Sequence, residues 1–288
     1  MFIYSKMIVK KIHQVVKTID LLPSEIESKE NIIKKNPGYH YTLWTDETLE
    51  KLAMKNHKGL YDSWKTLKGI QKSDLGRYLV LYVHGGFYCD TDFYLNKGFE
   101  TLEIRQGNIY FSPSTPNLPW MDEGITNYFI YTEPGEQFFL DLIDEALKRI
   151  STYVHRDPSY ISSTSGKILI EYVMKNKKYN IHSFKNKIVN MYCSHTDTTD
   201  SIGYHVGGNA KSDKSRTWLN GNVVGLIGAE CYLRRKMGVQ GNICQLPIII
   251  ILIFLLALIM IYWRKTIFKK TLILKNGIIN SWKIGKIG

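Results

Sequence analysis

The chain has 288 residues, of which 44% are hydrophobic and 12% aromatic, and its formal net charge is +12. This composition is typical of a globular protein and excludes an intrinsically disordered chain. Seven of the Lys and Arg residues lie in residues 246–288, which contain no Asp or Glu. Because much of the excess charge is confined to this tail, we expect no nucleic-acid partner.

Strand and helix patterns alternate at the start of the chain. A strand is predicted over residues 7–16, a helix over 23–35, a second strand over 39–44 and a second helix over 45–56. The first of these helices begins at a proline and is followed by Asn36-Pro37-Gly38, which suits a helix start and stop. Such alternation predicts an α/β sheet that binds ligands at the carboxyl ends of its strands.

The most informative segment follows. An apolar helix is predicted over 69–83, Gly85-Gly86 ends it, and a strand is predicted over 87–93. Asp90 and Asp92 are two positions apart on that strand, so their carboxylates would project from the same face about 7 Å apart. Two carboxylates at a strand end suit a hard divalent cation that also bridges phosphate oxygens.

Asp74 and Arg77 lie three residues apart on one face of the preceding helix. They offer an acceptor and a donor to a polar ligand such as a sugar. The alternative is an ordinary ion pair within the helix, worth roughly a few tenths of a kcal/mol. The spacing alone leaves both interpretations open.

The pattern becomes less regular downstream. Strands are predicted over 108–112 and 126–131, amphipathic helices over 135–150 and 166–175, and polar loops over 196–201 and 207–216. The cysteines are Cys89, Cys193, Cys231 and Cys244, and their spacing matches no metal finger. We therefore expect free thiols.

Residues 246–263 contain no charged side chain. A helix of this length spans about 27 Å, close to the hydrocarbon thickness of a bilayer. Tyr262, Trp263, Arg264 and Lys265 close the segment with residues typical of a membrane interface. We predict a globular domain over 1–245, a single-pass transmembrane helix over 246–263 and a basic tail over 264–288.

The orientation of this span stays open. Basic residues are more numerous on its tail side, which by the positive-inside rule places the tail in the cytoplasm and the main domain across the membrane. The segment from Met1 to Lys6 lacks the apolar core of a signal peptide, and a tail anchor would leave the domain in the cytosol. These two arguments conflict.

Several blocks of the sequence carry a family resemblance. They are Lys11-Ile12-His13-Gln14, Asn36-Pro37-Gly38-Tyr39, Leu43-Trp44-Thr45-Asp46, Ser73-Asp74-Leu75-Gly76-Arg77-Tyr78, Gly85-Gly86-Phe87-Tyr88-Cys89-Asp90-Thr91-Asp92, Thr126-Asn127-Tyr128-Phe129-Ile130, Thr164-Ser165-Gly166 and Gly203-Tyr204-His205. In this order they resemble glycosyltransferase family 32, whose members carry a DXD sugar-binding motif. The resemblance covers residues 8–205 and is most specific in the block that ends at Asp92.

The resemblance implies a GT-A fold, a UDP- or GDP-hexose donor, Mn²⁺ or Mg²⁺ as cofactor, and retention of anomeric configuration. By position it implies that Asp74, Arg77, Asp90 and Asp92 are catalytic and that Asp90, Asp92 and His205 bind the metal. The donor-binding residues it implies are His13, Gln14, Trp44, Asp74, Arg77, Asp90 and Asn127. The acceptor would be a glycan, a lipid or a protein.

The chain also departs from the family. Val16 stands where members often carry tryptophan. Trp218 matches a later family tryptophan, but the stretch that separates it from His205 is long. Simpler interpretations also remain for single residues: His13 as a buried structural histidine and Trp44 as part of the core.

The leading hypothesis is a membrane-anchored glycosyltransferase that moves a hexose from a nucleotide-sugar to an acceptor hydroxyl. A metal-dependent nucleotidyltransferase would also use Asp-x-Asp, but it should show an upstream Gly-Ser pair and a third carboxylate, which the sequence does not offer convincingly. A non-catalytic, membrane-tethered sugar-binding protein is the third hypothesis, and the intact acidic and basic residues speak against it. The sequence leaves the sugar, nucleotide, acceptor, linkage and oligomeric state open.

Overall fold

The computed structural model describes residues 8–113, 124–152, 160–176, 178–184, 188–190, 201–205 and 260. The chain divides into two compact units, residues 1–240 and 241–288, and the fold described below is that of the first. No helix among the described residues is both long and apolar enough to cross a membrane. The span predicted over 246–263 lies outside the described residues, apart from Met260, and stays a prediction.

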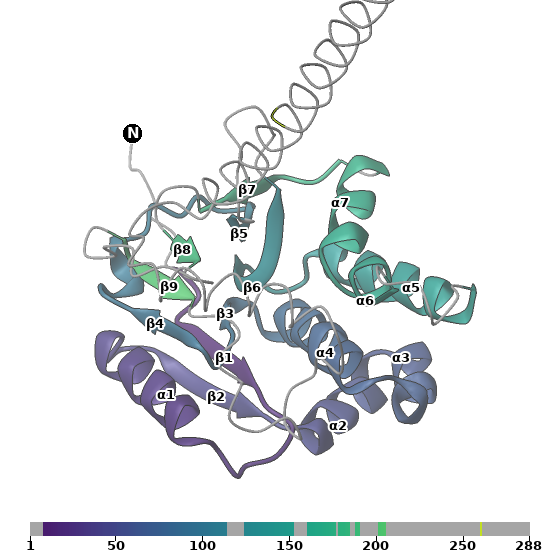
Figure 1. The fold of residues 1–288 in the computed structure, drawn as a ribbon, viewed down its shortest axis with the longest axis horizontal. Helices are drawn as coiled ribbons and strands as arrows, with labels where there is room; N and C mark the ends of the chain where they lie inside the picture. The colour runs from purple at the N-terminus through teal and green to yellow at the C-terminus, as the bar shows by residue number, and fades with distance from the viewer. Residues whose placement is uncertain are drawn as a thin grey trace, which may run out of the picture. The chain divides into compact units, whose positions relative to one another are not determined.

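A six-stranded sheet forms the centre of the first unit, in the order β2-β1-β3-β6-β5-β7 (Figure 1). Its strands are β1 (Lys11–Val15), β2 (His40–Trp44), β3 (Gly86–Cys89), β5 (Ile109–Pro113), β6 (Ile125–Thr132) and β7 (Ile181–Ser183). Strand β1 is parallel to β2 and β3, and β5 is parallel to β7, whereas β6 is antiparallel to both of its neighbours. The carboxyl end of β3 therefore meets the beginning of β6 at one edge of the sheet.

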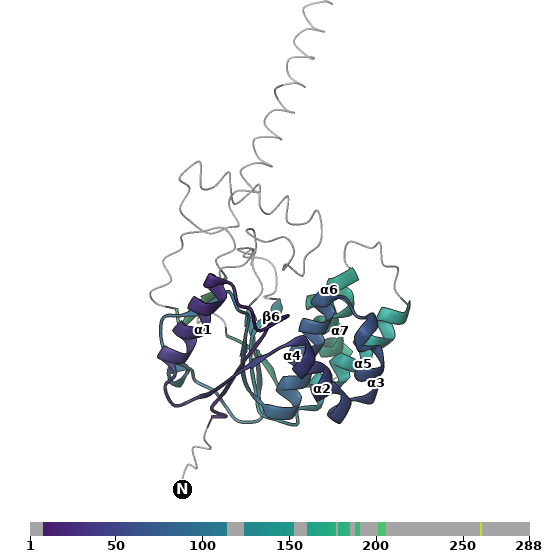
Figure 2. The ribbon, with the colours of Figure 1, turned by 90° about the horizontal axis from the view of Figure 1, so that it is seen from below.

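Helices cover both faces of this sheet (Figure 2). One face carries α1 (Pro23–Lys35), and the other carries α2 (Asp46–Asn56), α3 (Lys58–Ser63), α4 (Gly69–His84), α5 (Gln137–Thr152), α6 (Tyr160–Thr164) and α7 (Lys167–Asn176). The predicted α/β class is confirmed, and most predicted helices match within a few residues. Helix α3 was not predicted; it begins where the His57 ring accepts a hydrogen bond from the Leu60 amide, 3.1 Å.

The hydrophobic core has two parts, one on each face of the sheet. Successive side chains of β3 point to opposite faces, so Phe87 and Cys89 pack toward α1 while Tyr88 packs toward α4. Phe87 stacks on Phe99 with 4.1 Å between ring centroids. Each buried side chain of this size contributes roughly 1.5–3 kcal/mol. Burial on both faces holds β3, and hence the residue that follows Cys89, in a defined place.

A second, three-stranded sheet lies beside the first. It contains β4 (Phe93–Leu95), β9 (Gly203–His205) and β8 (Ile188–Asn190), in the order β4-β9-β8. Strands β4 and β9 are antiparallel, and Phe93 lies opposite His205. Gly203 permits this close pairing, because a Cβ there would lie 2.7 Å from the Phe93 ring and 2.8 Å from the Tyr94 carbonyl oxygen. The pairing places His205 next to the segment that precedes β4.

The single strand predicted over 87–93 is wrong. Strand β3 ends at Cys89, Thr91 and Asp92 form a turn, and β4 begins at Phe93. The Phe93 amide donates to the Asp90 carbonyl, 3.1 Å, and this bond closes the turn. The chain changes sheets here, so Asp90 and Asp92 do not share a strand face.

Candidate active site

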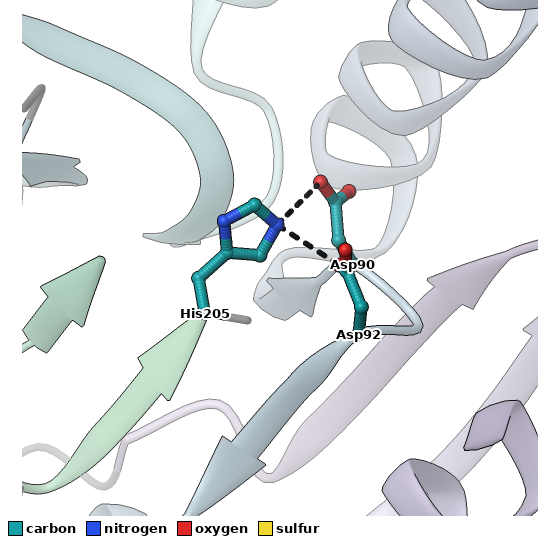
Figure 3. A group of neighbouring side chains, drawn as sticks. All are labelled: Asp90, Asp92 and His205. Atoms are coloured by element: carbon teal, nitrogen blue, oxygen red, sulfur yellow. Dashed lines mark ion pairs between the residues drawn. The ribbon is translucent and has the colours of Figure 1, made fainter. Parts of the chain in front are cut away.

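The three predicted metal ligands come together where the two sheets meet (Figure 3). The His205 Nε2 atom lies 2.9 Å from Asp92 Oδ1 and 3.7 Å from Asp90 Oδ2. One ligand atom from each of the three residues falls within 4.8 Å of the others. The turn therefore achieves what the predicted strand was expected to do: it aims both carboxylates at one point.

The charges of this cluster stabilise one another. Burial alone would lower the pKa of His205, but the Asp92 and Asp90 carboxylates together outweigh burial and raise this pKa above its ordinary value. Burial would raise the pKa of Asp92, and the His205 ring reverses this and lowers it. The His205 ring also stacks on Tyr128, with 4.3 Å between centroids and 5° between planes. The two carboxylates thus make the space beside them favourable for positive charge.

The Asp90 carboxylate is oriented by its own neighbours. Its Oδ1 accepts hydrogen bonds from the Tyr88 hydroxyl, 2.7 Å, and from Arg77 Nη1, 3.0 Å. The other oxygen, Oδ2, is the one that faces His205, at a distance too long for a hydrogen bond. Asp90 therefore presents one oxygen toward the cluster while the other is held by the protein.

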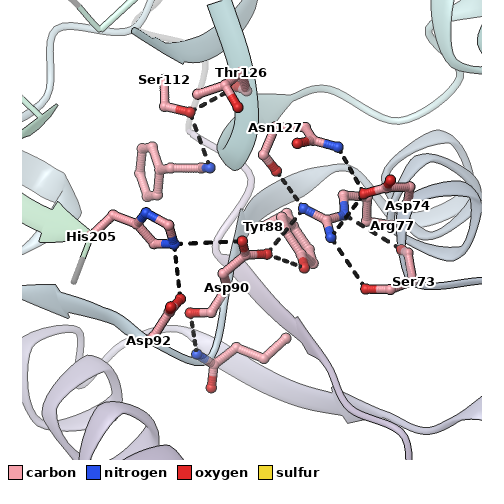
Figure 4. A network of polar contacts seen from close by, with 12 residues as sticks. Ser73, Asp74, Arg77, Tyr88, Asp90, Asp92, Ser112, Thr126, Asn127 and His205 are labelled. Carbon is pink, nitrogen blue, oxygen red and sulfur yellow. Dashed lines mark hydrogen bonds and ion pairs between the residues drawn. The ribbon is translucent and has the colours of Figure 1, made fainter. Parts of the chain in front are cut away.

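Arg77 joins this cluster to a second, buried group of polar side chains (Figure 4). Its guanidinium contacts Asp74 Oδ1 at 3.1 Å, the Ser73 hydroxyl at 3.2 Å and the Asn127 carbonyl at 2.7 Å. Arg77 is only 5% exposed, and its guanidinium lies 4.6 Å from the centre of the Tyr88 ring. The ion pair between Asp74 and Arg77 exists, but it is buried and directly bonded to Asp90, unlike a solvated helix pair.

Asp74 is held from two further sides. Its Oδ1 accepts from Asn127 Nδ2, 2.9 Å, and its Oδ2 accepts from the Ser165 hydroxyl, 2.7 Å. Ser165 lies between α6 and α7, and its carbonyl accepts from the Tyr78 hydroxyl, 2.7 Å. The predicted residues Asp74, Arg77, Asp90 and Asn127 therefore form one connected network.

An irregularity in β6 positions two of these groups. The pairing of β5 with β6 shifts register between Phe111 and Ser112. The buried Ser112 hydroxyl bridges the shift, because it donates to the Thr126 carbonyl, 2.7 Å, and accepts from the Phe129 amide, 3.3 Å. Between those two bonds lie Asn127, which contacts Arg77, and Tyr128, which stacks on His205.

His13 and Trp44 contact each other beside the sheet. Trp44 Nε1 donates to His13 Nδ1, 3.2 Å, and His13 Nε2 lies 2.9 Å from the Gly85 carbonyl. An indole N–H only donates and a carbonyl only accepts, so the proton of His13 sits on Nε2. Burial lowers the pKa of His13 to about 4. Both ring nitrogens are engaged within the protein, as in a structural histidine, and the donor-binding roles of His13 and Trp44 stay predictions.

Sequence reasoning assigned no role to Tyr88, Ser112, Tyr128 or Ser165. Three of them, Tyr88, Tyr128 and Ser165, lie inside the blocks that carry the family resemblance, but the blocks do not reveal which side chains these residues contact. Ser112 acts through a register shift that no sequence pattern reveals. Trp218 lies outside the described residues.

Residues 23–108 match the family described as a glycosyltransferase sugar-binding region containing the DXD motif. This region is similar to the sugar-binding region of the DXD glycosyltransferases. The match contains Trp44, Asp74, Arg77, Asp90 and Asp92, and the predicted family resemblance is confirmed.

Three relatives illustrate the similarity. The chain is 26% identical over 174 residues to a mannosyl phosphorylinositol ceramide synthase of Saccharomyces cerevisiae, covering 60% of this chain and 44% of the relative. It is 33% identical over 101 residues to an inositol phosphoceramide mannosyltransferase of Schizosaccharomyces pombe, covering 34% and 28%. An uncharacterized glycosyltransferase of Acanthamoeba polyphaga mimivirus is 27% identical over 219 residues, covering 66% and 82%. The chain thus spans less than half the length of the two yeast relatives.

Two solved structures are also similar. The PaToxG glycosyltransferase has a TM-score of 0.42 and 19% identity, covering 59% of this chain and 69% of that one. A glycosyltransferase involved in the glycosylation of the major capsid of PBCV-1 has a TM-score of 0.41 and 11% identity, covering 70% and 96%.

Proposed function

We propose that this protein is a metal-dependent glycosyltransferase that moves a hexose from a nucleotide diphosphate-sugar to an acceptor hydroxyl. The observation that carries the proposal is the convergence of His205 with Asp90 and Asp92, the two aspartates of the region that matches the DXD glycosyltransferases. Asp92, His205 and Asp90 would each offer one ligand atom to the cation, and for Asp90 this atom would be Oδ2. A GT-A fold and retention of anomeric configuration complete the proposal and come from the family resemblance.

The donor set suits a divalent cation. Two carboxylate oxygens are ligands that Mg²⁺ and Mn²⁺ both accept, whereas an imidazole nitrogen is a poor ligand for the harder Mg²⁺. Of the two, Mn²⁺ fits the group better. When bound, the cation would neutralise the diphosphate that leaves with the nucleotide.

The remaining residues of the network would shape the donor side. Arg77 offsets part of the negative charge of Asp74 and Asp90, which lowers the repulsion between this edge of the sheet and an anionic donor. Asp74 holds Asn127 by a hydrogen bond, and both N–H groups of Asn127 are used within the protein, so its side-chain oxygen would be the atom offered to a sugar hydroxyl. Because such groups are fixed before the donor arrives, little ordering entropy is lost on binding.

The names of the two yeast relatives make mannose the first sugar to test and a lipid the first acceptor. We also propose that residues 246–263 anchor the protein to a membrane, because they form an uncharged stretch closed by aromatic and basic residues. An anchored enzyme would meet a lipid acceptor without leaving the bilayer surface.

The test is a donor panel. The full chain is incubated with Mn²⁺ and UDP- or GDP-linked hexoses, and the products are identified. We expect nucleoside diphosphate and free or transferred sugar, whereas release of hexose 1-phosphate, the leaving group when the nucleotidyl group is transferred, would favour a nucleotidyltransferase. Asp92→Asn should lower the rate by at least about 100-fold, since a cation at a leaving group supplies several kcal/mol.

The matched control is Asp62→Asn, which removes an exposed helix carboxylate that pairs with Lys58. It should keep the full rate. Equal turnover by the wild type and Asp92→Asn across the whole panel would rule out the metal role of Asp92.

A further inference from the structure

The side chain of Gln14 is completely buried on β1 and uses both of its N–H groups within the protein. Its Nε2 atom donates to the Asp90 carbonyl, 3.1 Å, and to the Ser28 hydroxyl, 3.3 Å. Its Oε1 accepts from the Tyr41 hydroxyl, 2.6 Å. The Asp90 carbonyl only accepts, so the orientation of the amide is fixed. Gln14 has no N–H left for a nucleotide-sugar.

Ser28 extends this contact from α1. Its hydroxyl is completely buried, accepts from Gln14 and donates to the Phe93 carbonyl, 2.7 Å. The carbonyls of Asp90 and Phe93 are the first and last of the turn that contains Asp92. Gln14 and Ser28 together therefore hold both ends of that turn.

Tyr41 fixes the other side of the amide. Burial raises the pKa of its hydroxyl far above the ordinary value, so the hydroxyl stays protonated and donates to Gln14. Side chains from two strands and one helix thus hold the turn from Asp90 to Phe93. The carboxylates of Asp90 and Asp92 themselves point toward His205 (Figure 4).

We propose that Gln14 is a positioning residue of the metal site: with Ser28 and Tyr41 it holds the Asp90–Phe93 turn and thereby sets the affinity for the cation. The inference rests on the proposed metal-dependent function. It replaces the expectation that Gln14 binds the donor. Groups that orient metal ligands typically change metal affinity by about 10–100-fold when they are removed.

The experiment measures Mn²⁺ binding to the full chain without donor, from the electron paramagnetic resonance signal of free Mn²⁺. Gln14→Leu keeps the side-chain volume and removes all three hydrogen bonds, and it should weaken binding by about ten-fold. Ser28→Ala loses the bond to the Phe93 carbonyl and should weaken binding less, whereas Ser28→Thr keeps the hydroxyl and should bind as the wild type does.

Asn31 provides the matched control. It also lies on α1 and pairs with β4, where its amide group exchanges two hydrogen bonds with the main chain of Leu95, 3.1 and 2.7 Å. Asn31→Leu removes these bonds just beyond the turn. It should lower the free energy of unfolding while Mn²⁺ affinity falls clearly less than in Gln14→Leu, which separates positioning from general destabilisation.

Kinetics give a second readout. At saturating Mn²⁺ the KM for the donor should be the same in Gln14→Leu and the wild type. A raised donor KM with unaltered Mn²⁺ affinity would instead show that Gln14 touches the donor, and it would overturn the proposal. If Gln14→Leu does not fold, equal Mn²⁺ affinity of Ser28→Ala and Asn31→Leu overturns it as well.

The failure of this inference and that of the proposed function look different. A wild type that binds Mn²⁺ no better than Asp92→Asn contradicts the metal-dependent function and the inference with it. A wild type that binds Mn²⁺, an Asp92→Asn that does not, and a Gln14→Leu that binds equally well contradict only the inference.

Discussion

Tyr128 and His205 lie ring on ring, almost parallel, although they come from different sheets. The stacked face leaves the edge of the imidazole directed at Asp90 and Asp92. Aromatic pairs of this kind are worth about 0.5–1.5 kcal/mol beyond the area they bury. Tyr128 therefore restricts the direction in which His205 presents its nitrogen.

The first prediction concerns this stack. Tyr128→Leu should weaken Mn²⁺ binding several-fold, because the His205 ring loses its support, whereas Tyr128→Phe keeps the ring and should bind nearly as the wild type does. Isothermal titration with Mn²⁺ compares the three proteins. Equal affinity in Tyr128→Leu would mean that β9 alone orients His205.

The second prediction concerns the charge of Arg77. Arg77→Met leaves Asp74 and Asp90 buried without their counter-charge, and breaking a buried pair in this way typically costs about 3–5 kcal/mol. Urea unfolding followed by tryptophan fluorescence should show a loss of this size. Lys51→Met, which breaks an exposed helix pair with Glu47, should leave the unfolding curve nearly unchanged. Similar curves for the two variants would contradict the tight coupling of Arg77 to its carboxylates.

The third prediction concerns His13 and pH. Its folded pKa of about 4 lies below the ordinary value of 6.5, so the unfolded chain takes up the proton first as the pH falls. The titration of His13 should therefore lower the free energy of unfolding by on the order of 3 kcal/mol between pH 7 and pH 4. His13→Gln lacks this titration, so the difference in free energy of unfolding between it and the wild type should shrink on acidification. His40→Gln, at an exposed histidine of β2, should follow the wild type, and parallel curves for all three proteins would contradict the prediction.

The fourth prediction concerns the pairing of β4 with β9. Gly203→Ala places a methyl group against the Phe93 ring and the Tyr94 carbonyl, and overpacking of this kind costs roughly 1–3 kcal/mol. Mn²⁺ affinity should fall together with the melting temperature, because β9 carries His205. Gly38→Ala is the control, since its Cβ would meet only the end of the Lys10 side chain, at 3.9 Å. A destabilised Gly203→Ala protein with full Mn²⁺ affinity would show that His205 does not depend on this pairing.

The sequence predicted the individual helices and strands well, but it predicted poorly where a strand ends and the chain passes to another sheet. Helix α4 was recognisable from its apolar run and the following Gly85-Gly86, where positive backbone angles of 60° and 95° suit glycine. The turn at Asp92 was missed, because Phe87–Phe93, with its alternating residue types, looks like one continuous strand when the change of sheet is not known. A period of two describes a strand but does not reveal where its pairing stops.

The site shows the same division. Asp74, Arg77, Asp90 and Asp92 could be singled out from the sequence because they are close together in one motif. The support of Ser165 for Asp74 comes from a turn 91 residues away, and that of Ser112 from a register shift, so neither follows from a local pattern. Gln14 was predicted to bind the donor, and its contact with the Asp90 main chain could not be foreseen, since this contact depends on how β1 and β3 pair.

The pairing of Phe93 with His205 has a consequence for folding. It joins segments separated by more than a hundred positions, and contacts of such long range are slow to form, because a large loop must close first. Asp90 and Asp92 are in place as soon as β3 and its turn exist, but the imidazole arrives only with β9. A refolding chain should therefore regain its helices before it binds Mn²⁺ tightly, and the appearance of tight binding marks the moment at which the two sheets have joined.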